Sequence, residues 1–136
     1  MKVIVCLDEC LGMMFNSRRQ SRDRAVIADI LKMTEREELY IGQYSEKLFS
    51  ESGGKYTVSD SMLDIAQKGE FCFVESERLS GYIHRIEEII VYRWNRRYPA
   101  DLYLDIDIEN QGFSLVKSQE FEGYSHEKIT KEIFRK

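Results

Sequence analysis

The chain has 136 residues, of which 43% are hydrophobic, 32% are charged and one is proline, and its formal net charge is −4. This composition is typical of one globular domain and excludes a disordered, collagen-like or low-complexity chain. No apolar run approaches the ~20 residues that a membrane span requires, so we expect one soluble domain, residues 1–136, without a membrane partner.

The first half of the chain predicts strands that alternate with helices. Residues 1–8 contain Val3, Ile4, Val5 and Leu7 in nearly unbroken apolar order, which is typical of a central strand buried on both faces. The elements expected after this strand are a loop over residues 9–21, a helix over 22–33 capped by Ser21, a strand over 38–42, a helical turn over 45–50, a break at 52–54 and a helix over 60–67.

The second half predicts strands in closer succession. The elements expected are a strand over residues 70–75, a short helix over 77–84, a strand over 86–94 that periodicity alone does not separate from a helix, an alternating strand or extended arm over 102–108, and two β segments over 113–121 and 127–134 around a turn at Gly123. Together the two halves predict a single-domain α/β fold. Its mixed sheet, with helices, pairs strands in parallel first and closes in an antiparallel hairpin.

The cysteines indicate the compartment. Cys6, Cys10 and Cys72 are few and odd in number, unlike the disulfide framework of a small secreted domain. Asp8 and Glu9 also interrupt the apolar start before a secretory signal could form. We therefore expect a cytoplasmic protein. No metal site is predicted, because the cysteines lack a second Cys or His pair at zinc-site spacing.

Several residues stand in an order that resembles the dihydrofolate reductase fold in reduced form. A first strand ends at Asp8, a loop follows with Gly12, and an acidic residue, Asp23, stands at the first helix. A second strand ends at Gly42 before a short helix, and the chain closes with FSLVKSQEFEGY and a final strand, similar to the family's terminal hairpin. The resemblance implies a dihydrofolate reductase-like fold and makes Asp23 the candidate catalytic residue, as a polar ligand contact or proton donor. The alternative is a first-turn acid that interacts with the helix dipole.

The departures from that family concern its cofactor. Glu75 and Ser76 stand where the family has two glycines that let the backbone approach a nucleotide pyrophosphate. Gln43, Tyr44 and Ser45 replace basic and threonine residues, and the middle of the chain is short. These departures predict that no cofactor is bound, and a residual NADPH-dependent reductase is the alternative.

The opening GMMFN-x-RRQSRD is also similar to that of short bacterial proteins, some of which carry a ribonuclease Z label. This similarity implies RNA binding or RNA processing. Metal-dependent ribonuclease chemistry needs histidine-rich motifs that hold two ions. The only histidines, His84 and His126, lie 42 residues apart, so the similarity bears on partners rather than on mechanism.

Two arginine-rich segments stand out from an acidic chain. Residues 17–24 and 93–98 each carry a formal charge of +3, which leaves −10 for the remainder. Arg18, Arg19 and Arg22 precede a helix, so their guanidinium groups and the helix dipole can bind an anion. A solvated basic loop is the alternative.

The second segment combines cations with aromatic side chains. Arg93, Trp94, Arg96 and Arg97 form the mixture that stacks on bases and contacts phosphates. The alternative is a strand end whose aromatic groups pack and whose arginines pair with acids. No Ser-His-Asp triad is indicated, because neither histidine has an evident companion.

The sequence therefore predicts a small cytoplasmic domain that binds an anionic small molecule or partner on a reductase-like scaffold, without demonstrated catalysis. RNA binding or processing and a residual reductase are the alternatives. The arginines and Asp23 are expected to share one cleft. The sequence leaves open whether Met13, Met14 and Phe15 belong to the core or to a homo-oligomer interface.

Overall fold

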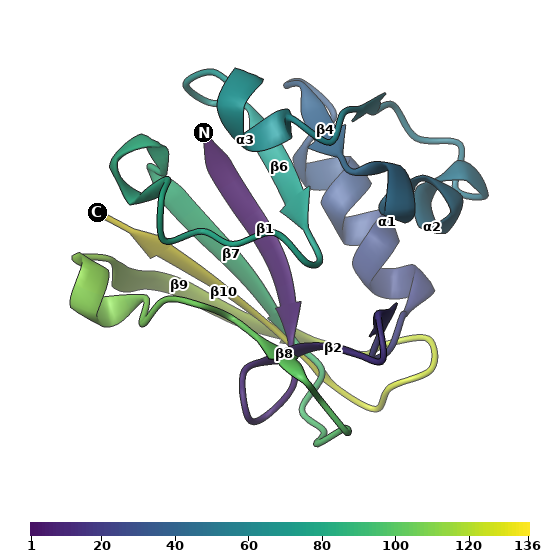
Figure 1. Ribbon diagram of the computed structural model, residues 1–136. Helices are drawn as coiled ribbons and strands as arrows, with labels where there is room; N and C mark the ends of the chain where they lie inside the picture. Colours follow the sequence, from purple (N-terminus) through teal and green to yellow (C-terminus); the bar gives the residue numbers. More distant parts are fainter.

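A seven-stranded sheet forms the centre of the computed structural model, which describes residues 1–136 (Figure 1). Its strands lie in the order β5 (Thr57–Val58), β4 (Leu39–Ile41), β6 (Phe71–Val74), β1 (Lys2–Leu7), β7 (Glu88–Arg93), β10 (Ile129–Arg135) and β9 (Ser114–Phe121). A second sheet contains β3 (Arg18–Arg19), β2 (Gly12–Phe15) and β8 (Leu102–Tyr103). The helices are α1 (Arg24–Met33), α2 (Glu46–Ser50) and α3 (Met62–Ile65), and 3₁₀ turns cover Gln43–Ser45, Ile83–Arg85 and Glu109–Gln111.

The strand directions confirm the predicted α/β fold with its mixed sheet. Strands β5, β4, β6, β1 and β7 are parallel to their neighbours, whereas β10 is antiparallel to β7 and β9 is antiparallel to β10. Strand β1 is the central strand, as its continuous apolar sequence predicted. Parallel neighbours require crossover connections, so the intervening segments cover both faces of the sheet.

Alternation along each strand divides the core into two apolar clusters. On β1, Val3 and Val5 point into one cluster and Ile4 into the other. The first cluster packs under α3 and the segments that follow β6 and β8, and the second packs under α1 and α2 (Figure 1). Helix α1 contributes Val26 and Ile30 to the second cluster, so its N-terminus is held against the sheet.

The prediction of a loop over residues 9–21 is wrong in part, because this segment contains a small hairpin. Strands β2 and β3 pair antiparallel, and Asn16 and Ser17 form the turn with positive φ angles of 53° and 61°. Met13 and Met14 are buried in the core, whereas Phe15 is 47% exposed. The hairpin places Arg19 beside the end of the central sheet.

Two later expectations also need correction. The short helix over residues 77–84 is absent apart from the 3₁₀ turn that begins at Ile83. This segment is held by Asp105, whose carboxylate accepts hydrogen bonds from the backbone N–H groups of Leu79 (2.8 Å) and Ser80 (3.0 Å). The arm over 102–108 forms a strand only at β8, although its alternating residues Leu104, Ile106 and Ile108 are buried as predicted. No helix combines the length and the apolar character that a bilayer crossing demands.

Candidate functional site

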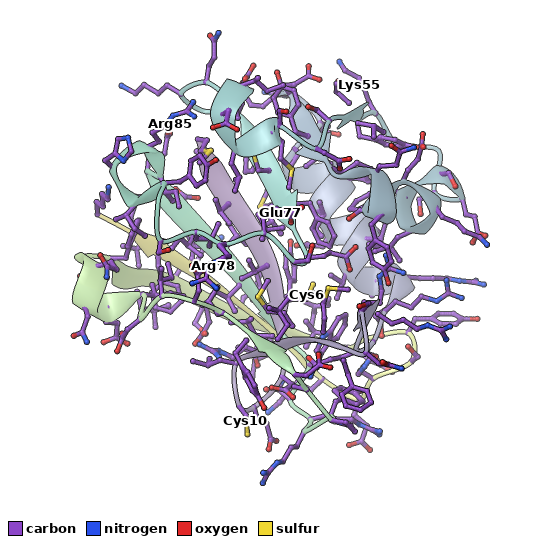
Figure 2. All side chains as sticks on the ribbon, viewed as in Figure 1. Cys6, Cys10, Lys55, Glu77, Arg78 and Arg85 are labelled. Carbon is purple, nitrogen blue, oxygen red and sulfur yellow. The ribbon has the colours of Figure 1, made fainter.

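A narrow pocket lies beside the C-terminal ends of β1 and β6 and the N-terminus of α1. Its cavity volume is ≈ 20 Å³, and it is lined by Cys6, Met13, Arg19, Gln20, Ser21, Arg22, Asp23, Val26, Ile27, Leu48, Phe73, Val74, Glu75 and Trp94. Figure 2 shows Cys6 within the molecule and Glu77 close to the end of β6. Carboxyl ends of parallel strands are the usual place for ligands in open α/β sheets.

The pocket continues outward into a wider groove between α1 and α2. Arg22, Asp23, Ile27 and Leu48 line both spaces. The groove is additionally lined by Arg24, Glu51, Ser52, Tyr124 and Ser125. A ligand that enters from solvent therefore meets the groove first and the narrow pocket second.

An ion pair closes one side of the pocket. Arg19 donates two hydrogen bonds to Glu75, from Nε at 2.8 Å and from a terminal nitrogen at 2.9 Å. Ser45 donates a further hydrogen bond to Glu75 at 2.7 Å, and the Tyr44 ring lies 4.6 Å from the Arg19 guanidinium carbon. Hydrogen bonding to Glu75 raises the pKa of Arg19 further. The charge of Arg19 is therefore balanced within the protein.

Gln20, a half-buried residue that lines the pocket, has an unsatisfied acceptor. The Gln20 amide nitrogen donates to Asp8 at 2.9 Å and to the carbonyl of Pro99 at 3.2 Å, so the orientation of the amide is determined. Its Oε1 atom is buried and accepts no hydrogen bond from the protein. Asp8 itself is fully buried and also accepts from the backbone N–H groups of Gly12 and Tyr98.

The carboxylate of Asp23 is surrounded by donors. One oxygen accepts from the backbone N–H groups of Ala25 and Tyr124, both at 2.8 Å. The other accepts from the backbone N–H groups of Ser125 (2.8 Å) and His126 (3.1 Å) and from Nδ1 of His126 (2.8 Å). Burial acts to raise the pKa of Asp23, but these hydrogen bonds outweigh burial and hold the pKa below its ordinary value. Asp23, rather than Ser21, is the N-cap of α1.

The histidine that contacts Asp23 completes a chain of polar groups. His126 is 6% exposed, and its ring stacks on Trp94 with a centroid distance of 4.8 Å and an interplanar angle of 22°. Its Nε2 atom lies 2.9 Å from the Ser21 hydroxyl and 3.1 Å from the Tyr98 hydroxyl. Of the two hydroxyl groups near Nε2, only that of Ser21 belongs to a residue that lines the pocket.

The backbone near the ends of β4 and β6 is capped by carboxylates of the chain itself. Glu77 accepts from the backbone N–H groups of Glu75 (3.1 Å) and Ser76 (3.2 Å), and Asp60 accepts from that of Gln43 (2.9 Å). A Cβ atom at Gly42 would lie 3.3 Å from an oxygen of Asp60 and 3.4 Å from one of Glu77. Two carboxylates thus meet beside Gly42 and occupy these donors.

Comparison with known proteins identifies the architecture. A dihydrofolate reductase from Enterococcus faecalis, complexed with NADP(H) and RAB-propyl, superimposes with a TM-score of 0.69 over 98% of this chain and 94% of that chain, at 11% sequence identity. The fold is dihydrofolate reductase-like. No protein-family model matches the sequence, and no curated protein matches it. The comparisons give no support to the ribonuclease Z label.

Within this reductase-like fold, the first arginine segment is divided. Arg19 and Arg22 line the pocket, as does Asp23, whereas Arg18 does not. Arg18 is exposed on β3. The expectation that these arginines share one cleft with Asp23 therefore holds for Arg19 and Arg22 and is wrong for Arg18.

The second arginine segment lies elsewhere. Arg93 pairs with Glu132 on the neighbouring strand, and Arg96 and Arg97 are exposed outside the pocket. Trp94 lines the pocket but is only 4% exposed. One face of its ring is stacked on His126, so that face is not free to stack on RNA bases. The two arginine segments do not converge.

Sequence reasoning missed His126, Tyr98 and the contact of both with Ser21. Asp23 and His126 are 103 residues apart, and no local motif connects them. The prediction that neither histidine has a companion is therefore wrong for His126. No group of three or more His, Cys, Asp or Glu side chains is arranged to hold a metal ion. Cys10 is exposed at the periphery (Figure 2), whereas burial raises the pKa of Cys6 well above its ordinary value.

Proposed function

We propose that the protein binds a small organic anion in the groove between α1 and α2, without a nicotinamide cofactor. The observation that carries this proposal is the groove itself, which has a cavity volume of ≈ 710 Å³ and combines Arg22 and Arg24 with the apolar side chains of Ile27 and Leu48. Such a combination suits a ligand with an apolar body and one charged group.

Arg22 is the residue that we expect to hold the anion. Its side chain is exposed and has no carboxylate partner, and it lines both the pocket and the groove. Arg19 is already paired with Glu75. Arg24 lies 4.7 Å from the Tyr124 ring centre and adds positive charge to the groove wall. The negative end of the ligand is therefore expected in the groove.

The variant Arg22→Ala tests the charge of the ligand. The probes are phenyl phosphate and 4-aminobenzoate, titrated by isothermal calorimetry and by NMR chemical shifts. A lost charge-assisted hydrogen bond costs about 1.5–3 kcal/mol, so we expect affinity to fall roughly 10- to 150-fold. The matched control is Arg18→Ala, which removes the same charge outside the pocket. The proposal fails if the parent protein binds neither probe, or if both variants lose affinity equally.

The absence of a nicotinamide cofactor is tested separately. The reductase from Enterococcus faecalis was solved with NADP(H), but in this chain Glu77 and Asp60 already accept the backbone N–H groups near Gly42. Like charges repel, so phosphates are disfavoured beside these carboxylates. A complex with a micromolar Kd would be saturated at a protein concentration about 100-fold higher than that Kd. We expect NADPH fluorescence to remain unchanged up to this protein concentration. Saturable quenching would revive the residual reductase.

A further inference from the structure

Three side chains, two of which line the pocket, form a hydrogen-bonded chain. Asp23 accepts from Nδ1 of His126 at 2.8 Å, and Nε2 of His126 lies 2.9 Å from the hydroxyl of Ser21. These are the contacts of an acid, a base and a nucleophile in an acyl-transfer enzyme, which are recognised by geometry rather than by order in the sequence. We propose that Ser21 is a nucleophile that hydrolyses carboxylic esters bound where the pocket opens into the groove.

The hydrogen bonds determine which nitrogen of His126 is the base. Asp23 is a carboxylate and can only accept, so Nδ1 carries the proton. In the neutral ring, Nε2 then has a free lone pair within reach of two hydroxyl groups, that of Ser21 at 2.9 Å and that of Tyr98 at 3.1 Å, of which Ser21 is the nearer. The Ser21 hydroxyl donates to Nε2, and the Tyr98 hydroxyl, 3.4 Å away, is placed to donate to the Ser21 oxygen. His126 is therefore ready to accept the proton of Ser21.

The base is held rigidly on every side. The Trp94 ring stacks on one face of His126. Asp23 is in turn held by the backbone N–H groups of Tyr124, Ser125 and His126, so the carboxylate cannot turn away from the ring. A site of this kind needs a nucleophile and a base in fixed relative positions. Both supports are buried.

The nucleophile is more exposed than the base. Ser21 lines the pocket and is only half-buried, whereas His126 is buried behind it. Arg22 follows Ser21 directly and lines the same pocket, so its positive charge is available to the oxyanion that forms during attack. This inference rests on the proposed function for the class of substrate, an ester whose acyl or alcohol part carries a negative charge.

The reaction balances with water as its only co-reactant. The Ser21 oxygen bonds to the acyl carbon while its proton passes to Nε2 of His126, and the negative charge moves to the carbonyl oxygen. The carbonyl re-forms, the bond to the alcohol oxygen breaks, and that oxygen takes the proton from Nε2. Water then attacks the acyl-serine with its proton passing to Nε2, and Ser21 leaves with that proton as the carboxylic acid is released.

A fluorophosphonate probe tests the nucleophile directly. We expect the intact mass of the protein to increase by one phosphonyl group, and peptide mapping to place that group on Ser21. Labelling should vanish in Ser21→Ala and slow at least about 100-fold in His126→Gln. The control is Ser118→Ala, which alters an exposed serine on β9 and should label at the parent rate. Circular dichroism verifies that each variant is folded.

Hydrolysis of 4-nitrophenyl acetate gives the second readout. We expect a burst of nitrophenolate equal to the protein concentration, followed by slower turnover, and no burst in Ser21→Ala. Absence of labelling at Ser21 in the parent protein overturns the inference, as does equal labelling of Ser21→Ala. If phenyl phosphate binds and Ser21 is not labelled, ligand binding stands and the hydrolase fails. If Ser21 is labelled and neither anionic probe binds, the hydrolase stands and the proposed ligand class fails.

Discussion

Replacing Asp23 by asparagine is expected to lower the free energy of unfolding by about 3 kcal/mol, because several buried N–H donors lose a charged acceptor. The Asp23 side chain has no exposed surface and accepts backbone hydrogen bonds from Ala25, Tyr124, Ser125 and His126. An asparagine amide nitrogen would face several of these donors instead of accepting from them. Urea denaturation followed by tryptophan fluorescence measures the change.

The dependence of this difference on pH identifies its cause. The pKa of Asp23 is lower in the folded chain than its ordinary value of 3.8, because hydrogen bonds outweigh burial. A carboxyl whose folded pKa is depressed contributes its full stability above the unfolded pKa and loses it as pH falls. The gap between the parent and Asp23→Asn is therefore expected to be constant above about pH 5 and to shrink below about pH 4.

A control separates this carboxylate from the general effect of charge. Glu35 is exposed after α1 and makes no side-chain hydrogen bond or ion pair, so Glu35→Gln should change stability by less than about 0.5 kcal/mol at any of these pH values. If Asp23→Asn also changes stability by less than about 1 kcal/mol, the turn at residues 123–126 does not depend on Asp23, and the positioning of His126 needs another explanation.

The second large effect is expected for Gly123→Ala, which should lower the free energy of unfolding by about 3 kcal/mol. A Cβ atom at this position would lie 2.7 Å from Oδ2 of Asp23 and 2.7 Å from the backbone carbonyl oxygen of His126. Neither atom belongs to a flexible side chain that could move aside. The turn must shift, and the hydrogen bonds from residues 124–126 to Asp23 weaken with it.

Gly81→Ala is the matched control for this substitution. No heavy atom lies within 4 Å of a Cβ built on Gly81, and its φ angle is not in the left-handed region. Its stability should stay within about 0.5 kcal/mol of the parent value. We further expect Gly123→Ala to slow fluorophosphonate labelling of Ser21, because the same shift displaces His126. Unchanged stability and labelling in Gly123→Ala would contradict the tight packing of this turn.

Much of the architecture could be predicted from local patterns. The apolar runs in β1 and β6 indicated strands buried on both faces, and the spacing of Val26 and Ile30 indicated the helix that covers one of those faces. The errors lie where tertiary contacts replace local preference. The segment after β6 donates backbone hydrogen bonds to Asp105, and these replace hydrogen bonds that the expected helix would have made.

The candidate site could be predicted only in part. The high local content of arginine predicted that Arg19 and Arg22 belong to the site, and both line the pocket. The sequence could not predict that Arg19 is paired with a carboxylate and Arg22 is not, because Glu75, the partner of Arg19, lies 56 residues further along the chain. Aromatic residues beside arginine indicated stacking on bases, yet Trp94 stacks on His126 inside the protein. Composition reveals which groups are present but not which ones neutralise each other.

By itself, the sequence determined the single domain, the order of helix α1 and the main strands of the central sheet, and the change from parallel to antiparallel pairing, because a buried strand or helix face requires apolar residues at a spacing that can be recognised locally. Only the tertiary structure decided that Asp23 and His126, 103 residues apart, meet behind Ser21. It likewise decided that Glu77 and Asp60 converge beside Gly42. Hydrogen bonds act over about 3 Å. Those between distant segments therefore depend on where the segments lie in the folded chain, and they produce no periodic pattern in the sequence.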